Sequence, residues 1–264
     1  MSSETTKFDV INDGTFSLDP GAAFGVTPKN VWSKEFQPNE NYRISLNCNI
    51  CVISMDDKHY LIDSGIGNNP GKYLEKWFEA KPNRNLENYM KKNGIEKFEA
   101  IFHTHLHFDH MGHSFTDLSE SKSYVHHLEI ENFRKPEDFA AASYTYKSSE
   151  PDVSNLIPLF SDTRTGNFEL IHTGGHTTGH MAIIFHNESL RLMFLGDLAP
   201  TTFQLKPTRL TAIDSEPLKS MNAKKILLKK AIREEFTLVM SHDQKNEIVT
   251  VSGDADDPKY RSIF

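Results

Sequence analysis

The chain has 264 residues, of which 38 % are hydrophobic and 25 % are charged, and its formal net charge is −7. This composition is typical of a globular protein with a sizeable core, and the acidic balance argues against a broad nucleic-acid surface, which usually needs clustered Lys and Arg. The polar start of the chain shows no signal peptide, and no stretch approaches the run of about 18 apolar residues that spans a bilayer. We therefore expect a cytoplasmic protein that binds neither nucleic acid nor membrane.

Apolar runs bounded by turn residues predict strands in chain order at 46–54, 59–63, 98–104, 168–173, 181–186, 190–196 and 236–241. Helical patterns lie between them at 71–80, at 85–95 with Gly94 as C-terminal cap, and at 217–235. Strands that come in runs, with helices between only some of them, favour sheets packed together under helices over a strictly alternating βαβ array.

Cys48 and Cys51 form a C-x-x-C motif inside the apolar run ISLNCNICVISM. A redox pair needs a helix N-terminus to stabilise the thiolate, and the chain has no second cysteine pair to complete a zinc site. We therefore interpret both as cysteines packed within a strand.

The most informative segment is IFHTHLHFDHMGH, residues 101–113, which follows the apolar run FEAIF. In an extended turn, His105 and His107 project to the same side and can bind one metal ion. Asp109 and His110 follow where the chain turns into a helix, and they can face a second ion. This mixture of imidazole and carboxylate suits Zn²⁺, Fe or Mn²⁺ better than Ca²⁺ or Mg²⁺.

Three other apolar runs also end in a candidate ligand. FELIHTGGH leads to His176, LRLMFLGD ends at Asp197, and TLVMSH ends at His242. Ligands carried by separate strand ends and converging on one sheet edge form the arrangement that a two-metal hydrolase needs.

The ordered motifs THLHFDH, GGHTTGH, FLGD and SHD resemble the metallo-β-lactamase superfamily, and LIDSGIG resembles its leading Asp-containing turn. The segment LDPGAAFGVTPKNVW resembles a branch that includes quorum-quenching lactonases and organophosphate hydrolases. The resemblance implies an α+β fold, an αββα four-layer sandwich, as a single domain over residues 1–264. Residues 1–45 would form an N-terminal arm over the active site.

The resemblance also implies roles for individual residues. His105, His107 and His176 would hold the first metal; Asp109, His110 and His242 would hold the second; and Asp197 would bridge both. Asp63 would brace the His105 loop from behind the ligands, and His180 would line the pocket or support His176. Phe24, Val26 and Pro28 would form either an apolar wall over the pocket or a packed N-terminal arm. We interpret the other histidines as ordinary polar residues. For His113, which lies close to the metal loop, a position in the pocket is left open.

The implied enzyme is a dinuclear metallohydrolase that carries two divalent ions, Zn²⁺ first, with Fe or Mn²⁺ also compatible. Two adjacent ions lower the pKa of a shared water, so a metal-bridging hydroxide would attack a small ester or lactone, with Asp109 as catalytic acid or base. Class B β-lactamases often place a Cys among their metal ligands, and none of the motifs here contains one. Glyoxalase II adds a helical substrate domain after the last His ligand, whereas residues 243–264 follow His242 here. We therefore expect neither of these two enzymes.

One departure concerns the substrate. Many acyl-homoserine lactonases place a Tyr shortly after the bridging Asp, but this chain has Pro200, Thr201 and Thr202 there. We therefore expect weak activity on acyl-homoserine lactones. An iron-dependent persulfide dioxygenase-like oxidoreductase and a phosphotriester or phosphodiester hydrolase stay open as alternatives, as does a homodimer.

Overall fold

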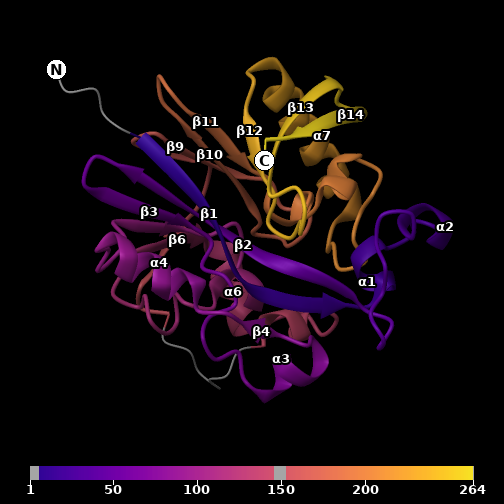
Figure 1. The fold of residues 1–264 in the computed structure, drawn as a ribbon, viewed down its shortest axis with the longest axis horizontal. Coiled ribbons are helices and arrows are strands. Elements are labelled where there is room, and N and C mark those ends of the chain that lie inside the picture. Colours follow the sequence, from indigo (N-terminus) through magenta and orange to yellow (C-terminus); the bar gives the residue numbers. More distant parts are fainter. Residues whose placement is uncertain (1–5, 146–152, 264) are drawn as a thin grey trace.

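The computed structural model describes residues 6–145 and 153–263, which form two seven-stranded sheets stacked face to face (Figure 1). The first sheet has the order β4-β1-β2-β3-β5-β6-β7. Its strands are β1 (Thr6–Leu18), β2 (Ile44–Met55), β3 (Lys58–Ile62), β4 (Lys81–Pro82), β5 (Ala100–Phe102), β6 (Ser123–His126) and β7 (Leu156–Leu159).

The second sheet has the order β14-β13-β12-β11-β10-β9-β8. Its strands are β8 (Thr163–Thr165), β9 (Phe168–His172), β10 (Met181–His186), β11 (Arg191–Phe194), β12 (Thr237–Val239), β13 (Ile248–Asp254) and β14 (Asp257–Ser262). All seven predicted strands are present within these elements. β5 is shorter than predicted, because the chain leaves the sheet at His103 to form the histidine loop.

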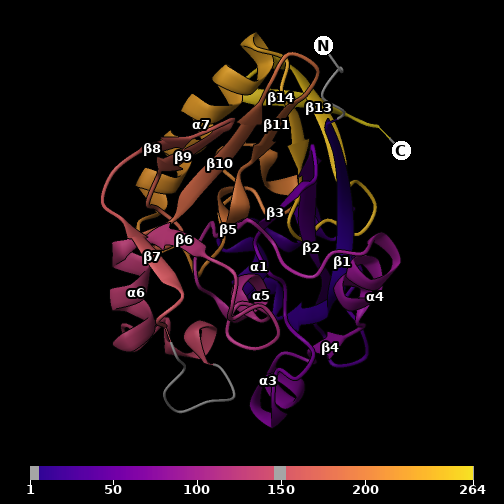
Figure 2. The same ribbon diagram turned by 90° about the vertical axis from the view of Figure 1, so that its left-hand side faces the viewer.

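Helices cover the outer faces of both sheets, as Figure 2 shows. α7 (Pro217–Arg233) packs Leu227, Leu228 and Ala231 against the second sheet, and α4 (Asn85–Asn93) packs Leu86 against the first. The other helices are α1 (Pro20–Phe24), α2 (Lys29–Trp32), α3 (Lys72–Trp77), α5 (Phe108–Met111) and α6 (His127–Arg134), with short 3₁₀ helices at Ala141–Tyr144, Gly196–Leu198 and Thr202–Leu205. Gly94 caps α4 with a φ of 66°, as the sequence predicts.

The core between the sheets is made of aromatic and branched side chains from both. Phe102 of the first sheet lies 4.5 Å from Phe168 of the second, measured between ring centroids, and Ile53 and Ile183 are fully buried in the same cluster. Together with α4 and α7 outside, this core confirms the αββα sandwich. Cys48 and Cys51 are free and buried on β2, which confirms their reading as packed strand residues.

Part of the predicted N-terminal arm belongs to the first sheet. Residues 6–18 form β1, which pairs antiparallel with β2 from Thr6↔Met55 to Leu18↔Ile44, so this part of the arm is a strand within the sheet. The rest of the described arm contains α1 and α2, and residues 1–5 lie outside the described residues. Within the described residues, no helix is long and apolar enough to cross a membrane.

Candidate metal centre

Four strand ends bring all seven predicted ligands together as two buried groups. The loop after β5 and α5 supplies the first segment; the turn after β9, the turn after β11 and the end of β12 supply the others. We call His105, His107 and His176 the histidine group, and Asp109, His110, Asp197 and His242 the mixed group. In each group the possible ligand atoms all lie within 4.8 Å of one another.

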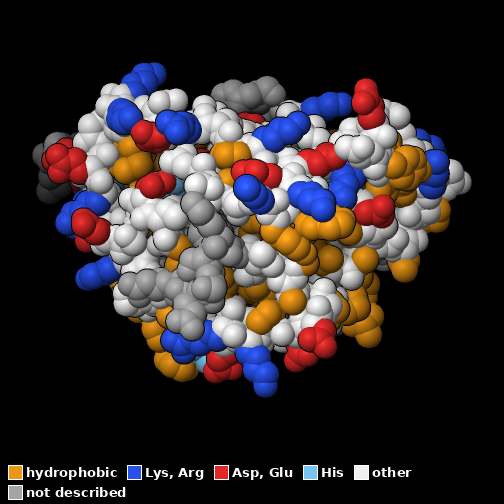
Figure 3. Space-filling view, turned by 90° about the horizontal axis from the view of Figure 1, so that it is seen from below, with side chains coloured by type: hydrophobic (Ala, Val, Ile, Leu, Met, Phe, Trp, Pro, Cys, Tyr) orange, Lys and Arg blue, Asp and Glu red, His pale blue; other side chains and the backbone are white. Residues whose placement is uncertain are grey.

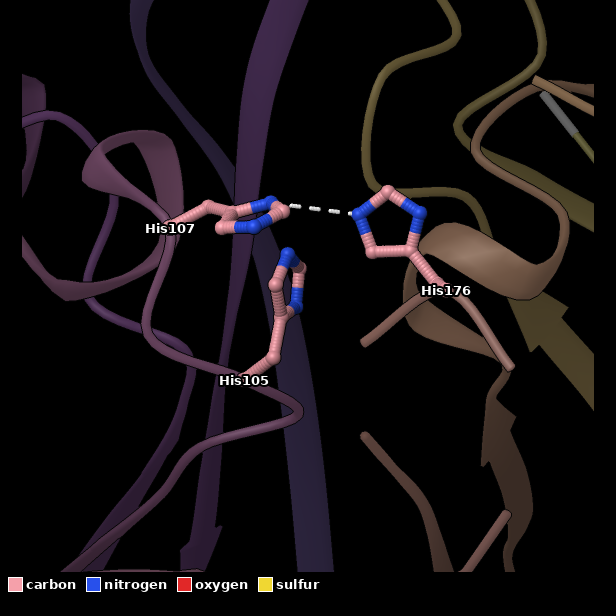
Figure 4. Close-up of side chains that lie close together, drawn as sticks. All are labelled: His105, His107 and His176. Carbon is pink, nitrogen blue, oxygen red and sulfur yellow. Dashed lines mark hydrogen bonds between the residues drawn. The ribbon is translucent and has the colours of Figure 1, made fainter. Parts of the chain in front are cut away.

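The histidine group joins two segments that are about 70 positions apart in the sequence. Figure 4 shows the rings of His105 and His107, from one loop, turned toward His176 on another; the His107 Nδ1 and His176 Nε2 atoms are 3.1 Å apart. Burial and the neighbouring histidines hold the pKa of His105 well below its usual range. Its ring is therefore neutral, which is the form that binds a metal ion.

The mixed group centres on the carboxylate of Asp197. One oxygen, Oδ1, lies 3.0 Å from His242 Nε2 and 3.4 Å from His110 Nε2, while the other, Oδ2, lies 3.5 Å from His176 Nε2. Burial raises the pKa of Asp197, but His242 and His110 lower it by more, so the pKa lies well below its usual range. This carboxylate therefore stays ionised between the two groups, where a bridging ligand would stand.

The chemistry of these residues fits divalent metal ions. His105 Nε2 is buried without a hydrogen-bond partner among the described residues, and the Nε2 atoms of His110 and His242 face each other at 3.1 Å. Buried ring nitrogens that point at one another need a shared proton or a cation, because two lone pairs repel. Imidazole nitrogens with carboxylate oxygens are the donor set that Zn²⁺, Fe and Mn²⁺ accept.

Hydrogen bonds behind the ligands orient three of the rings. His110 Nδ1 lies 2.8 Å from Asp63 Oδ2, and His242 Nδ1 lies 2.6 Å from the Asn47 carbonyl oxygen. His176 Nδ1 lies 2.9 Å from Asp214 Oδ1. A donor bond from Nδ1 leaves Nε2 free to face the centre. Asp63 also accepts from the backbone N–H and the hydroxyl of Thr104, so it contacts the residue before His105.

Asp214 was missed in the sequence, where it lies in the polar stretch TAIDSEP without a motif of its own. The backbone of His180 bonds to Thr173, Gly174 and Thr177 in the turn that carries His176, while its side chain has a role that the sequence did not predict. Its Nε2 accepts the backbone N–H of Asp197, and its Nδ1 contacts the Thr173 hydroxyl, so it supports Asp197. Gly196 has a φ of +52°, and a Cβ there would lie 2.6 Å from His180 Nε2; this approach requires glycine.

A narrow cavity of about 30 Å³ opens onto the mixed group. Its wall is mostly apolar, and it contains Phe16, Leu18, Phe24, Leu46, Phe78 and Phe108 beside Asp109, Asp197 and His242. A second small cavity adjoins the histidine group and is lined by Phe139, Tyr144 and Ile213 beside His107 and His176. No Lys or Arg of the described chain lines either cavity.

The predicted apolar wall needs correction at two of its three positions. Phe24 lines the cavity and packs on Trp32 and Phe203. Val26 is 92 % exposed and Pro28 is also exposed. Helix α1 ends at Phe24 and the chain turns at Gly25, so the residues that follow face away from the cavity.

The histidine that the sequence left open, His113, is directed away from the centre. It is buried, and its ring contacts Asp13 through Nε2 at 3.0 Å and Asp117 through Nδ1 at 3.1 Å. It lines a larger groove of about 760 Å³ beside α4, and no candidate metal ligand lines that groove.

Comparison with known proteins agrees with this geometry. Residues 44–242 match the family model of the metallo-beta-lactamase superfamily. A probable metal-dependent hydrolase from Staphylococcus aureus has 26 % identity over the whole of both chains and a TM-score of 0.87. The dizinc quorum-quenching lactonase AidC shares the fold, with 15 % identity, a TM-score of 0.74, and coverage of 99 % of this chain and 97 % of that one.

A probable metallo-hydrolase of Methanocaldococcus jannaschii is 25 % identical over 103 residues, which are 37 % of this chain and 50 % of that protein. The match therefore spans about half the length of that curated relative. The family model covers most of the chain and includes all seven predicted ligands. The chain belongs to the metallo-beta-lactamase superfamily.

Proposed function

We propose that this protein hydrolyses a small neutral ester or lactone with two divalent metal ions, Zn²⁺ first, held by the histidine group and the mixed group. The observation that carries the proposal is a set of seven buried candidate ligands that opens onto an apolar cavity without cationic side chains. Bound ions would supply a hydroxide nucleophile from water near neutral pH and polarise the scissile carbonyl.

The residues of the chain would position the reactants and move the proton. Asp109 lines the cavity, with Oδ2 3.4 Å from His242 Nε2. Burial raises the pKa of Asp109, so its carboxylate is a better proton acceptor than an exposed one. Asp109 would take the proton from the attacking water and pass it to the leaving oxygen, which balances the hydrolysis.

The cavity supports a small and uncharged substrate. Its wall of phenylalanine rings suits the acyl group of a neutral substrate. On the face shown in Figure 3, Lys and Arg side chains are interspersed with Asp and Glu. That mixed distribution gives no support to a polyanionic substrate.

The experiment measures metal content and turnover together. Protein purified without chelator should hold about two ions per chain by elemental analysis, and it should hydrolyse aryl esters or simple γ-lactones such as γ-butyrolactone faster than acyl-homoserine lactones. Loss of one oxyanion donor costs about 10²–10³ in rate. We expect the turnover of acyl-homoserine lactones to be lower by about this factor than in lactonases that have a Tyr at the position of Pro200. A single iron per chain, with oxygen consumption and no ester turnover, would contradict the proposal.

A further inference from the structure

The carboxylate of Glu129 lies on α6, outside every motif that supplies a candidate ligand, and it is fully buried. We propose that Glu129 is a positioning residue that fixes the two loops of the histidine group against each other. This inference rests on the proposed metal centre, because the loops in question supply His105, His107 and His176.

Each oxygen of the Glu129 carboxylate holds a different loop. Oε2 accepts the backbone N–H of Leu106, between His105 and His107, at 3.0 Å. Oε1 accepts the hydroxyl of Thr177, which follows His176, at 2.6 Å, and the backbone N–H of Gly179 at 3.2 Å. One side chain therefore sets the spacing between two segments that do not adjoin in the sequence.

Two further contacts tighten this arrangement. Tyr144 donates its hydroxyl to Glu129 Oε2 at 3.0 Å, and its ring packs edge-on against His107 with 4.7 Å between centroids. A Cβ on Gly179 would lie 2.7 Å from the Glu129 backbone nitrogen and 2.8 Å from Oε1. The second loop therefore docks so closely on α6 that only glycine fits at its point of contact.

The mixed group has separate supports. His110 is oriented by Asp63 and His242 by the Asn47 carbonyl oxygen. Within the part of the chain that the structure describes, Glu129 makes no hydrogen bond to Asp109, His110, Asp197 or His242. A change at Glu129 should therefore act on one of the two metal sites.

Glu129→Gln tests this inference with little change in volume. An amide offers one acceptor oxygen, so either the Leu106 N–H or the Gly179 N–H must lose its partner. We expect the affinity for the ion in the histidine group to fall about 10–100-fold, with the affinity of the mixed group unchanged. The control is Glu131→Gln, the same substitution at an exposed position of the same helix.

The readouts are Zn²⁺ titration against a chromophoric chelator and the paramagnetically shifted N–H signals of the Co²⁺-loaded protein. The His176 N–H near Asp214 reports the histidine group, and the His110 N–H near Asp63 reports the mixed group. If Glu129→Gln does not fold, Thr177→Val removes only one donor to Oε1 and should shift the same site in the same direction, by less.

A purely structural role would lower the melting temperature in chelator and leave both affinities at their wild-type values; that result would overturn the inference. A larger loss of metal affinity at the mixed group than at the histidine group in Glu129→Gln would overturn it too. The wild-type titration tests the proposed dinuclear centre separately, since the inference concerns the ratio of variant to wild-type affinity at the histidine group.

Discussion

At the scale of single residues, Asp197 and Asp63 should differ in what their loss costs. Asp197 lies between both groups, within 3.0 Å of His242 Nε2 and 3.5 Å of His176 Nε2, so Asp197→Ala should weaken both metal sites and abolish measurable turnover. Asp63→Ala leaves every ligand in place, and it should cost about 10–100-fold in affinity or activity. Metal analysis and kcat/KM on one ester are the measurements.

The matched control for these two variants is Asp138→Ala, which removes an exposed carboxylate. It should keep wild-type turnover and metal content. If Asp197→Ala retained two ions per chain and wild-type turnover, the bridging assignment would be wrong.

The sequence predicts the ligands but misses most of their supports, and the reason is physical. His105, His107, Asp109 and His110 share one short motif, so their convergence is local. Asp214 acts on His176 across 38 positions, and Glu129 has the sequence surroundings of a charge on an amphipathic helix. Only the folded chain brings such side chains to their partners.

At the scale of elements, β1 shows how a strand escapes prediction. Its sequence TKFDVINDGTFSL has a register shift between Asn12 and Thr15, so the alternation of apolar and polar residues is interrupted. Buried Asp13 breaks the apolar pattern too, yet it accepts the backbone N–H groups of Ile66 and Gly67. A β-bulge and a buried carboxylate that accepts hydrogen bonds both interrupt the pattern of a strand, so the sequence predicts a loop at these positions.

The helix α1 should set the length of the acyl group through Phe24. Phe24→Leu removes part of a ring from the wall of a cavity of about 30 Å³, so we expect kcat/KM to rise for hexanoyl relative to acetyl aryl esters. Phe36→Leu is the control, because Phe36 packs on Phe24 with 4.8 Å between centroids but does not line the cavity. An unchanged ratio in Phe24→Leu would place the acyl group elsewhere.

The helix α7 should give the stability of the protein a pH dependence through Lys224. This side chain is buried beside Leu227 and Leu228 and donates to the Arg209 carbonyl oxygen at 2.9 Å. Burial, only partly offset by Asp214, lowers the pKa of Lys224 to about 7. In the unfolded chain a lysine titrates near 10.4.

Between these values the unfolded chain binds one proton more than the folded chain. The free energy of unfolding should therefore rise with pH from about 7 to 10, with a contribution of about 1.4 kcal/mol per pH unit. Urea denaturation at pH 7, 8 and 9 measures this slope. Lys224→Met should remove the contribution, whereas Lys229→Met, at an exposed position of the same helix, should keep it. Equal slopes in the two variants would contradict the prediction.

At the scale of the whole molecule, charge balance should select neutral substrates. Two divalent ions would bring four positive charges. Four buried carboxylates offset that charge: Asp109 and Asp197, which are candidate ligands, and Asp63 and Asp214, which contact candidate ligands. The described residues that line the two cavities include no Lys or Arg, and the chain as a whole has a net charge of −7. An anionic substrate would therefore lose its hydration without gaining a partner.

The test compares a neutral 4-nitrophenyl alkanoate with the 4-nitrophenyl monoester of a dicarboxylic acid of matched length, and with short RNA. Because burying a charge without a partner is strongly disfavoured, we expect kcat/KM for the neutral ester to be at least about tenfold higher, and no cleavage of RNA. Added salt screens long-range repulsion. If the difference in kcat/KM between the neutral and the anionic ester persists at high ionic strength, the cavity itself selects the neutral ester. Equal turnover of the anionic ester, or efficient RNA cleavage, would show that the centre keeps an excess of positive charge, and the proposal of a neutral substrate would fail.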